Sequence, residues 1–542
     1  MTESIPNLPP LTADAPQWQA LLAHGERLRG GTLSGLFAAD PQRVDRFTFR
    51  AEGILADFSR QRLDAPARAA LFELARAARL EDAIAALFAG EPLNFTEQRA
   101  ALHMAMRGGA PMPAQDAAML QDTDARMRDF SRRFHSGALL GHDGTPLRTV
   151  IHLGIGGSDL GPRLACEALA PVTDAPVVRF VANLDPHALE AALAGVDPRE
   201  TLFILSSKSF RTTETLNNAR AARAWLEQHF GRDQDFTAHF AAVTHARDDA
   251  IAYGVAPAYV FALPVWVGGR YSVWSAVGLP VLLSLGEAGF DALLNGAREM
   301  DAHFRTHALE DNLPVQLGLV DLWNASVLKH GTRAVLPYAH GLRTLPAWMQ
   351  QLEMESNGKR CQRNAQPCTL PTAPVVWGME GTLGQHAFHQ LLYQGMRDTA
   401  LEFIVVRPHN AATRQLAENA LAQAAALMQG RSLEKARAHL AQHGYGDARR
   451  EALAPHLTCR GEQPSTTLLL PALTPHTLGR LLALYEHKVF VQGWIWGINS
   501  FDQFGVELGK ELAHALNTGQ PPDDPATHAL LAEFDAPKAA DA

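Results

Sequence analysis

A hydroxyl-rich segment, residues 206–215, carries the clearest chemical signal in the sequence. It follows the apolar run Thr201–Leu205, which predicts a buried strand, and it precedes a segment that predicts a helix. Backbone N–H groups and hydroxyls at a helix N-terminus bind anions, phosphate above all. A loop in which Thr212 or Thr213 only caps the helix would need one or two hydroxyls. Six hydroxyls and a lysine exceed that need, so the segment favours a phosphate site over the capping loop.

Two glycine turns could bring backbone or charge close to a ligand. Residues 151–162 predict a strand, a turn containing Gly154, Gly156 and Gly157, and a helix start, with Ser158 offering a hydroxyl. The turn fails the dinucleotide fingerprint because Asp159 occupies the position of the third glycine, and a tight structural turn is the alternative. In the second turn, two glycines precede Arg270. Its permanent charge suits a phosphate or a developing oxyanion, and a surface arginine is the alternative.

Acid–base chemistry has two further candidate segments. Glu353 and Glu355 lie two residues apart, so one could be a catalytic base and the other a structural acid, although a solvated acidic loop is the alternative. His386 follows Gly384, and we expect it near a helix N-terminus, where the dipole disfavours its charged form. The chain has 23 histidines, so a surface role for His386 is the alternative.

Near the C-terminus, Lys510 lies on a predicted helix, with Gln503 and Glu507 before it at helical spacing. Glu507 could simply pair with Lys510. The sequence contains no HExxH, CxxC or carboxylate cluster that suggests a metal, and no serine elbow that suggests a hydrolase.

Short apolar runs alternate with helical patterns from about residue 149, which predicts βαβ units with mostly parallel sheets. The alternation pauses over residues 279–329, which we expect to be helical, and it then resumes. Two α/β sandwiches explain this pattern. The predicted strands are Thr149–Leu153, Val177–Val181, Thr201–Leu205, Phe240–Thr244, Ala334–Tyr338, Pro374–Trp377, Leu401–Arg407 and Thr466–Leu470. Residues 15–110 predict helices, one of them beginning at Pro66 with Asp64 as its cap.

Composition narrows the class of protein. A chain of 542 residues is too long for a single compact core, so two or more domains are expected. The net charge is −9 and no basic tract is present, which makes nucleic acid and acidic membranes poor partners. Four scattered cysteines favour a reducing compartment. The N-terminus lacks a secretory pattern, and no apolar run is expected to span a membrane. We therefore expect a cytoplasmic protein.

In their order along the chain, these motifs resemble the glucose-6-phosphate isomerase (phosphoglucose isomerase) family. The resemblance covers roughly Phe47 to Lys510 and includes Leu93–His103. It implies reversible aldose–ketose isomerisation of D-glucose 6-phosphate and D-fructose 6-phosphate through a cis-enediol(ate), in glycolysis and gluconeogenesis. It also implies no cofactor and no metal, and a homodimer with a shared active site.

The resemblance implies an α/β fold of two sugar-isomerase-type three-layer α/β/α sandwiches with mostly parallel sheets, plus an N-terminal helical region. We expect the helical region at 1–118 on the large domain, the small domain with the phosphate loop at 119–285, the large domain at 286–518 and a tail at 519–542.

The resemblance also implies residue roles. Glu355 would be the base that moves a proton between C1 and C2, and Arg270 would stabilise the enediolate. His386, reaching in from the partner subunit, would protonate the ring oxygen, with Glu214 orienting it, and Lys510 would assist at the O1 hydroxyl. The remaining substrate-binding residues are Gly157, Ser158, Ser207, Lys208, Ser209, Thr212 and Thr215 around the phosphate, and Gln351 and Gln503 along the sugar.

Three residues depart from the family pattern: Leu383 stands where Asn is usual, Val265 where an acid is usual, and Arg211 where a small hydroxylic residue is common. None replaces a named catalytic group. Two other functions stay open as alternatives. A non-catalytic sugar-phosphate sensor predicts loss of Glu355 or Arg270, and an NAD-dependent oxidoreductase is weakened by the failed glycine fingerprint.

Overall fold

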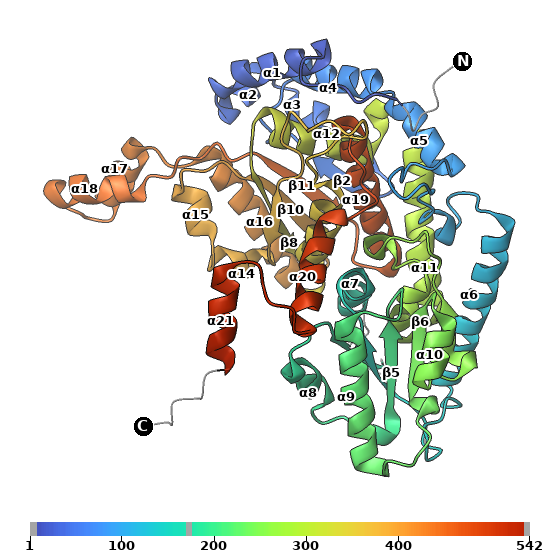
Figure 1. Cartoon of the computed structure of the whole chain (residues 1–542). Coiled ribbons are helices and arrows are strands. Elements are labelled where there is room, and N and C mark those ends of the chain that lie inside the picture. Colours follow the sequence, from blue (N-terminus) through green and yellow to red (C-terminus); the bar gives the residue numbers. More distant parts are fainter. Residues whose placement is uncertain (1–7, 170–175, 536–542) are drawn as a thin grey trace, which may run out of the picture. The chain divides into compact units, whose positions relative to one another are not determined.

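The computed structural model describes residues 8–169 and 176–535 (Figure 1). The predicted absence of a secretory signal concerned residues outside that range. By its internal contacts the chain divides into two compact units, Met1–Ser500 and Phe501–Ala542. This division falls before the predicted tail boundary at residue 519, so the segment containing Gln503 and Lys510 belongs to the second unit. The predicted domain boundaries otherwise stay predictions.

The first unit contains a five-stranded parallel sheet in the order β4-β3-β5-β6-β7. On one face, side chains such as Phe203 and Leu205 form a core with the helices α8, α9 and α10, and their neighbours Leu202 and Ile204 are equally buried. Burial on both faces explains why the strands are continuous apolar runs in the sequence. The elements are β3 (Thr149–Leu153), α7 (Leu160–Leu169), β4 (Val177–Val181), α8 (Pro186–Leu193), β5 (Thr201–Ser206), α9 (Thr213–Phe230), β6 (Phe240–Thr244), α10 (Arg247–Tyr253) and β7 (Val260–Ala262).

The second sheet of this unit has six strands in the order β1-β2-β11-β10-β8-β9. Its four later strands are parallel and were predicted within a few residues. They and their helices are α12 (Leu313–Leu322), β8 (Thr332–Tyr338), α13 (Leu345–Met349), β9 (Val375–Gly378), α14 (Gly381–Gln385), α15 (His389–Gln394), β10 (Ala400–Val406), α16 (Ala411–Gln429) and β11 (Ser465–Leu470).

The N-terminal region contains the predicted helices, but residues 91–104 form turns and residues 48–57 form strands. There β1 (Thr48–Ala51) and β2 (Ile54–Asp57) form an antiparallel hairpin, and β2 pairs with β11 of the larger sheet. The turn has positive φ at Glu52 and Gly53, which is the backbone of a tight hairpin turn, but Glu-Gly is a weaker sequence signal than Asn-Gly. The helices are α1 (Pro16–Arg29), α2 (Leu33–Ala39), α3 (Arg43–Arg46), α4 (Ala65–Ala77), α5 (Leu80–Ala89) and α6 (Ala114–His135). Asp64 caps α4 as predicted, accepting from the Ala67 N–H at 3.0 Å.

Two long helices, α11 (Leu279–Thr306) and α19 (Pro475–Trp496), pack against each other inside the first unit. Among the described residues, one helix at 276–306 is long and apolar enough to cross a membrane, by length and composition alone. Core helices pass the same test, and α11 buries one side along α19. α19 is buried almost throughout its second half, including Tyr485, Glu486, His487 and Lys488.

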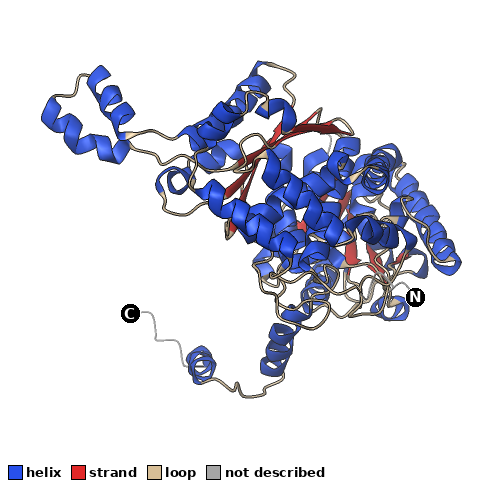
Figure 2. Ribbon diagram, turned by 90° about the horizontal axis from the view of Figure 1, so that it is seen from above, coloured by secondary structure: helices blue, strands red, loops and turns tan. Residues whose placement is uncertain are grey.

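Two helices extend from the first unit between α16 and β11, as Figure 2 shows. They are α17 (Leu433–Gln442) and α18 (Asp447–Leu453), and they share a small core of Ala436, Leu440 and Ala454. The second unit contains α20 (Glu507–Asn517) and α21 (Pro525–Asp535), so the predicted tail boundary at 519 falls just after α20 ends. The last residues of the predicted tail, 536–542, lie outside the described residues.

Candidate active site

The two phosphate-site candidates lie at the same edge of the smaller sheet. The chain turns from β3 to β4 on one side and continues through β5 to β7 on the other, so the strand order reverses between β3 and β5. Ligands of open α/β sheets bind outside the carboxyl ends of the strands at such a switch point. The glycine turn follows β3 and the hydroxyl-rich segment follows β5, and these two strands are hydrogen-bonded neighbours.

The hydroxyls of residues 206–215 do not serve as a helix cap. Thr212 occupies the N-cap position of α9, but its side chain makes no capping bond and instead lies 2.9 Å from the Ser207 hydroxyl. The hydroxyls of Ser206 and Thr215 are buried and have no hydrogen-bond partner in the chain. A buried hydroxyl without a partner costs about 1–3 kcal/mol. This geometry supports an anion at the α9 N-terminus over the capping alternative.

Lys208 ties this loop to the segment that leads to Arg270. Its ammonium donates to the Val267 carbonyl at 3.0 Å. Burial lowers the pKa of Lys208, and the neighbouring charge of Arg99 lowers it further. Arg211 of the same loop turns to solvent, with 81% of its side chain exposed and its nearest carboxylate, Asp249, 4.0 Å away. Ser209 is also exposed, whereas Ser206 and Ser207 are buried. The polar side chains of the loop therefore range from buried to exposed.

The glycine turn after β3 has a packing role. A Cβ on Gly157 would lie 2.0 Å from the carbonyl carbon of Gly269 and 2.5 Å from the Arg270 nitrogen. Only glycine therefore lets the two turns meet, which puts Ser158 and Arg270 on adjoining backbone segments. Gly156 has a φ of +60°, and a Cβ there would lie 3.1 Å from the amide nitrogen of Gln351. The close approach predicted for these glycines is thus to protein, and a ligand contact at Gly157 stays a prediction.

Arg270 is a fixed, buried cation. Its side chain is 1% exposed, and it donates to the Ser356 hydroxyl at 2.6 Å and to the Ser500 carbonyl at 2.7 Å. Tyr271 also contacts the Ser356 hydroxyl at 2.9 Å. The surface-arginine alternative is therefore wrong. Sequence reasoning missed Ser356, Tyr271 and Ser500, although each belongs to or adjoins a motif already singled out.

The two glutamates have separate environments. They lie in a π-helix, Gln350–Glu355, which is neither the extended loop nor the regular helix considered from the sequence. Glu353 is 1% exposed and bonded to Arg333 and Lys488; burial raises its pKa, whereas the Arg333 guanidinium favours its charged form. Glu355 is 22% exposed, and its Oε2 lies 3.7 Å from the Arg270 guanidinium without a hydrogen bond. The structural acid is therefore Glu353, and the carboxylate available for chemistry is Glu355.

Gln351 is the second residue of the same π-helix, and its side-chain oxygen is buried without a hydrogen-bond partner. The orphaned oxygens of Gln351 and Glu355 belong to one predicted site segment, and that of Thr215 belongs to a second. Polar atoms left unpaired in native interiors mark places where another group binds.

His386 lies elsewhere than expected on its helix. It is the C-terminal cap residue of α14, and its N–H donates to the Leu383 carbonyl, so the expected position near a helix N-terminus is wrong. Its side chain is exposed, as is that of Leu383. Within the described chain no hydrogen bond joins Glu214 to His386. Their predicted cooperation is therefore not made inside one subunit.

Lys510 and Gln503 belong to the second unit. Lys510 is exposed on α20 and pairs with Glu507 at 2.8 Å, as predicted. Gln503 precedes the short turn Phe504–Val506. Their contribution to the site stays a prediction.

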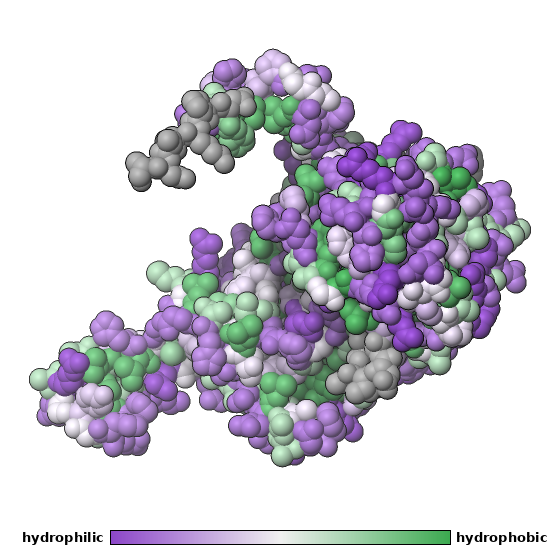
Figure 3. All heavy atoms as spheres, turned by 90° about the horizontal axis from the view of Figure 1, so that it is seen from below, coloured by the Kyte–Doolittle hydropathy of each residue, from purple (hydrophilic) through white to green (hydrophobic). Residues whose placement is uncertain are grey.

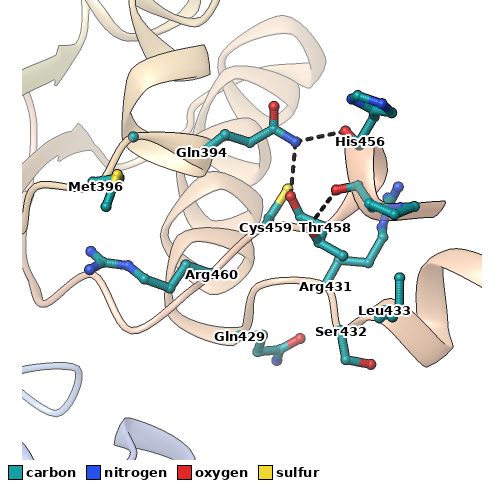
Figure 4. A pocket seen from close by; sticks show the side chains of 12 residues that line it. Gln394, Met396, Gln429, Arg431, Ser432, Leu433, His456, Thr458, Cys459 and Arg460 are labelled. Atoms are coloured by element: carbon teal, nitrogen blue, oxygen red, sulfur yellow. Dashed lines mark hydrogen bonds between the residues drawn. The ribbon is translucent and has the colours of Figure 1, made fainter. Parts of the chain in front are cut away.

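A separate hollow lies where the α17–α18 pair joins the rest of the first unit (Figure 4). Within it the Gln394 amide donates to the carbonyls of His456 and Thr458 at 2.8 Å each. None of the predicted site residues lines it. Among residues 8–169 and 176–535 no three His, Cys, Asp or Glu side chains are grouped to hold a metal ion.

Comparisons with known proteins agree on one family. Residues 57–537 match the family model described as phosphoglucose isomerase. The chain is 54% identical over 541 residues, 99% of its length and 98% of the relative's, to a glucose-6-phosphate isomerase of Aromatoleum aromaticum. It is 46% identical to one of Methylocella silvestris, over 94% of this chain and 95% of that one. A crystal structure of a glucose-6-phosphate isomerase from Chlamydia trachomatis superposes with a TM-score of 0.81 at 29% identity, covering 96% of this chain and 99% of that chain.

Proposed function

The chain belongs to the phosphoglucose isomerase family, and we propose that Glu355 and Arg270 carry out its reversible interconversion of glucose 6-phosphate and fructose 6-phosphate. The activity itself, an aldose–ketose isomerisation in glycolysis and gluconeogenesis, follows from the family. One observation supports the two residues above all: the Glu355 carboxylate, 22% exposed, faces the buried Arg270 guanidinium at 3.7 Å.

Aldose–ketose isomerisation moves one proton between adjacent carbons and leaves negative charge on oxygen. Glu355 takes the carbon-bound proton and returns it to the neighbouring carbon, because its free Oε2 has no competing donor. Arg270 stabilises the cis-enediolate, since its position is fixed before the charge develops. Neither step requires a redox cofactor.

The hydroxyl-rich segment holds the phosphate. The N-terminus of α9, the orphaned Thr215 hydroxyl and the Lys208 ammonium suit a dianion at the switch point. This remote anchor supplies binding energy that orients the reacting carbons. The residues assigned to it are Gly157, Ser158, Ser207, Lys208, Ser209, Thr212 and Thr215.

Ring opening uses the remaining residues. His386 delivers a proton to the ring oxygen with Glu214 orienting it, Lys510 assists at O1, and Gln351 and Gln503 line the sugar. Since His386 is exposed and unconnected to Glu214 in its own chain, we assign it to the site of a partner subunit.

Uncovered apolar surface supports a homodimer. Leu508 and Leu512 form one face of α20 and are 64% and 54% exposed, and Phe534 in α21 is 79% exposed. Figure 3 shows further hydrophobic atoms on the projecting helices, where Tyr445 is 42% exposed. Apolar faces of this kind are covered by association. A cytoplasmic location, supported by four free cysteines, and the absence of nucleic-acid or membrane partners complete the proposal.

The decisive experiment replaces Glu355 with Gln in the full-length protein. The variant should lose isomerisation, measured by coupling fructose 6-phosphate to glucose 6-phosphate oxidation, while it still binds substrate in calorimetry. Continued exchange of the substrate C2 hydrogen with solvent in this variant would remove Glu355 as the base. The sensor alternative predicts no turnover by the wild-type protein.

A further inference from the structure

Helix α19 holds the chain on both sides of Glu355. Its Lys488 and Val489 are adjacent residues, and both are buried. Lys488 contacts the residue two positions before Glu355, and Val489 contacts the residue two positions after it. The position of a carboxylate with no hydrogen bond at Oε2 depends on how its backbone is fixed.

On the near side the tie is ionic. The Lys488 ammonium donates to Glu353 Oε2 at 2.9 Å, and the Arg333 guanidinium of β8 donates to the same oxygen. All three side chains are at most 2% exposed. Buried charges are stabilised only by close partners, so this contact holds Glu353 firmly to α19.

The same charges extend into a buried group that we call the Glu353 cluster. It comprises Glu353, Arg333, Lys488, Asp321 and Glu402. Asp321 of α12 accepts from both cations, and Glu402 of β10 lies 3.5 Å from Arg333 and accepts from the Tyr485 hydroxyl. The cluster therefore connects the π-helix to the sheet and to two core helices.

On the far side the hydrogen bonds go to uncharged acceptors, backbone carbonyls and an amide oxygen. The Asn357 amide donates to the Val489 carbonyl at 2.9 Å, and its oxygen accepts from the Ser500 hydroxyl at 2.7 Å. Lys359 donates to the carbonyls of Glu355 and Ser356 at 3.1 and 2.9 Å. These bonds fix the exit from the π-helix, whose irregular turn is uncommon and must be held by its surroundings.

We propose that Glu353 and Asn357 are positioning residues that hold Glu355 against Arg270 through α19. This proposal rests on the proposed role of Glu355 as the base. In this proposal neither Glu353 nor Asn357 touches the reacting atoms. Each residue fixes one side of the turn that carries the Glu355 carboxylate. A base must lie within hydrogen-bond reach of the proton that it abstracts, so a loosened turn lowers the chemical rate before it affects substrate binding.

The first test replaces Glu353 with Gln, which keeps the shape of the side chain and removes its charge. We expect kcat to fall about 10- to 100-fold, as misplacement of a catalytic group by up to about 1 Å produces. KM should stay within about twofold, because the phosphate is held by residues 206–215. A larger KM with unchanged kcat would overturn the proposal.

Glu402→Gln is the matched control. Glu402 is equally buried and belongs to the same cluster, but within the described chain it makes no hydrogen bond to residues 350–357. Both variants should lower the melting temperature, whereas only Glu353→Gln should lower kcat. Equal losses of kcat in the two variants would mean that disturbing the cluster acts on the whole fold, and the positioning role would be rejected.

Asn357→Ala tests the far side without touching the ionic cluster, and it decides the question if Glu353→Gln does not fold. It should also lower kcat at nearly constant KM, and a wild-type kcat would contradict the proposal. Glu355→Gln separates the two levels of inference. If that variant isomerises, the base assignment fails; if it is inactive while Glu353→Gln and Asn357→Ala keep full kcat, only the positioning role fails.

Discussion

Adding one methyl group at Gly157 should disable the enzyme without touching any catalytic side chain. In the structure a Cβ at this position would lie 2.0 Å from the Gly269 carbonyl carbon and 2.2 Å from its oxygen, and real Cβ atoms do not approach within 3.0 Å. Both neighbours are backbone atoms, so no side chain can rotate away. The two turns must separate by about 1 Å, and Arg270 is the next residue after Gly269.

A displacement of about 1 Å at a catalytic group costs on the order of 100-fold in rate, so Gly157→Ala should lower kcat by about that factor. Overpacking should also lower the free energy of unfolding by about 1–3 kcal/mol. The assay is steady-state isomerisation with a coupled dehydrogenase, together with thermal unfolding followed by circular dichroism.

Gly331→Ala is the matched control, because a Cβ at Gly331 meets no atom within 4 Å. It should leave kcat and the melting temperature close to those of the wild type. If Gly157→Ala retains wild-type kcat, the contact between the two turns does not position Arg270, and the reasoning is refuted.

Three further predictions concern the phosphate loop and the fold. Thr215→Val should raise KM about 10-fold or more, because a hydrogen bond to a charged group is worth about 1.5–3 kcal/mol. The melting temperature should not fall, because this hydroxyl has no partner in the chain. An unchanged KM would remove Thr215 from the phosphate site. The pKa of Lys208 is lowered by burial, so as pH rises its charge is lost at a lower pH than that of an exposed lysine. Consequently kcat/KM should fall on the alkaline side, and Lys208→Arg should move that fall to higher pH; identical profiles would contradict this assignment. Asp64→Ala should lower the free energy of unfolding by about 1 kcal/mol by removing the α4 cap, with kcat unchanged, as measured by urea unfolding.

The parallel strands were predictable because they are buried on both faces. Runs such as Thr201–Leu205 are almost entirely apolar, so the sequence marks them clearly as strands. All of these residues are buried, and the strand is hydrogen-bonded to a neighbouring strand on each side. The hairpin at residues 48–57 was not predictable in the same way. Its turn uses Glu52 at positive φ, which few non-glycine residues adopt, and its pairing partner β11 lies far along the chain.

The site residues were predictable from motifs, but their environments were not. Nothing in the spacing of Glu353 and Glu355 reveals a π-helix, because the residues that bind both sides of that turn, Lys488 and Val489, lie more than a hundred residues further along the chain. The predicted placement of His386 near a helix N-terminus was wrong for a local reason. Helix α14 is only five residues long, so a residue expected near the beginning of a helix lies just after its end.

The N-terminal hairpin also has a consequence for biosynthesis. Strand β2 is completed by β11, with Asp57 opposite Thr467, so its partner is made roughly 400 residues later. At about 5–20 residues per second, the ribosome needs about 20–80 seconds to synthesise the intervening chain. Throughout that interval β2 has one unpaired edge and an apolar face that its own domain cannot yet cover. The newly made chain therefore depends on protection of this hairpin during translation, and mutations that slow elongation between the two strands should lower the yield of folded enzyme.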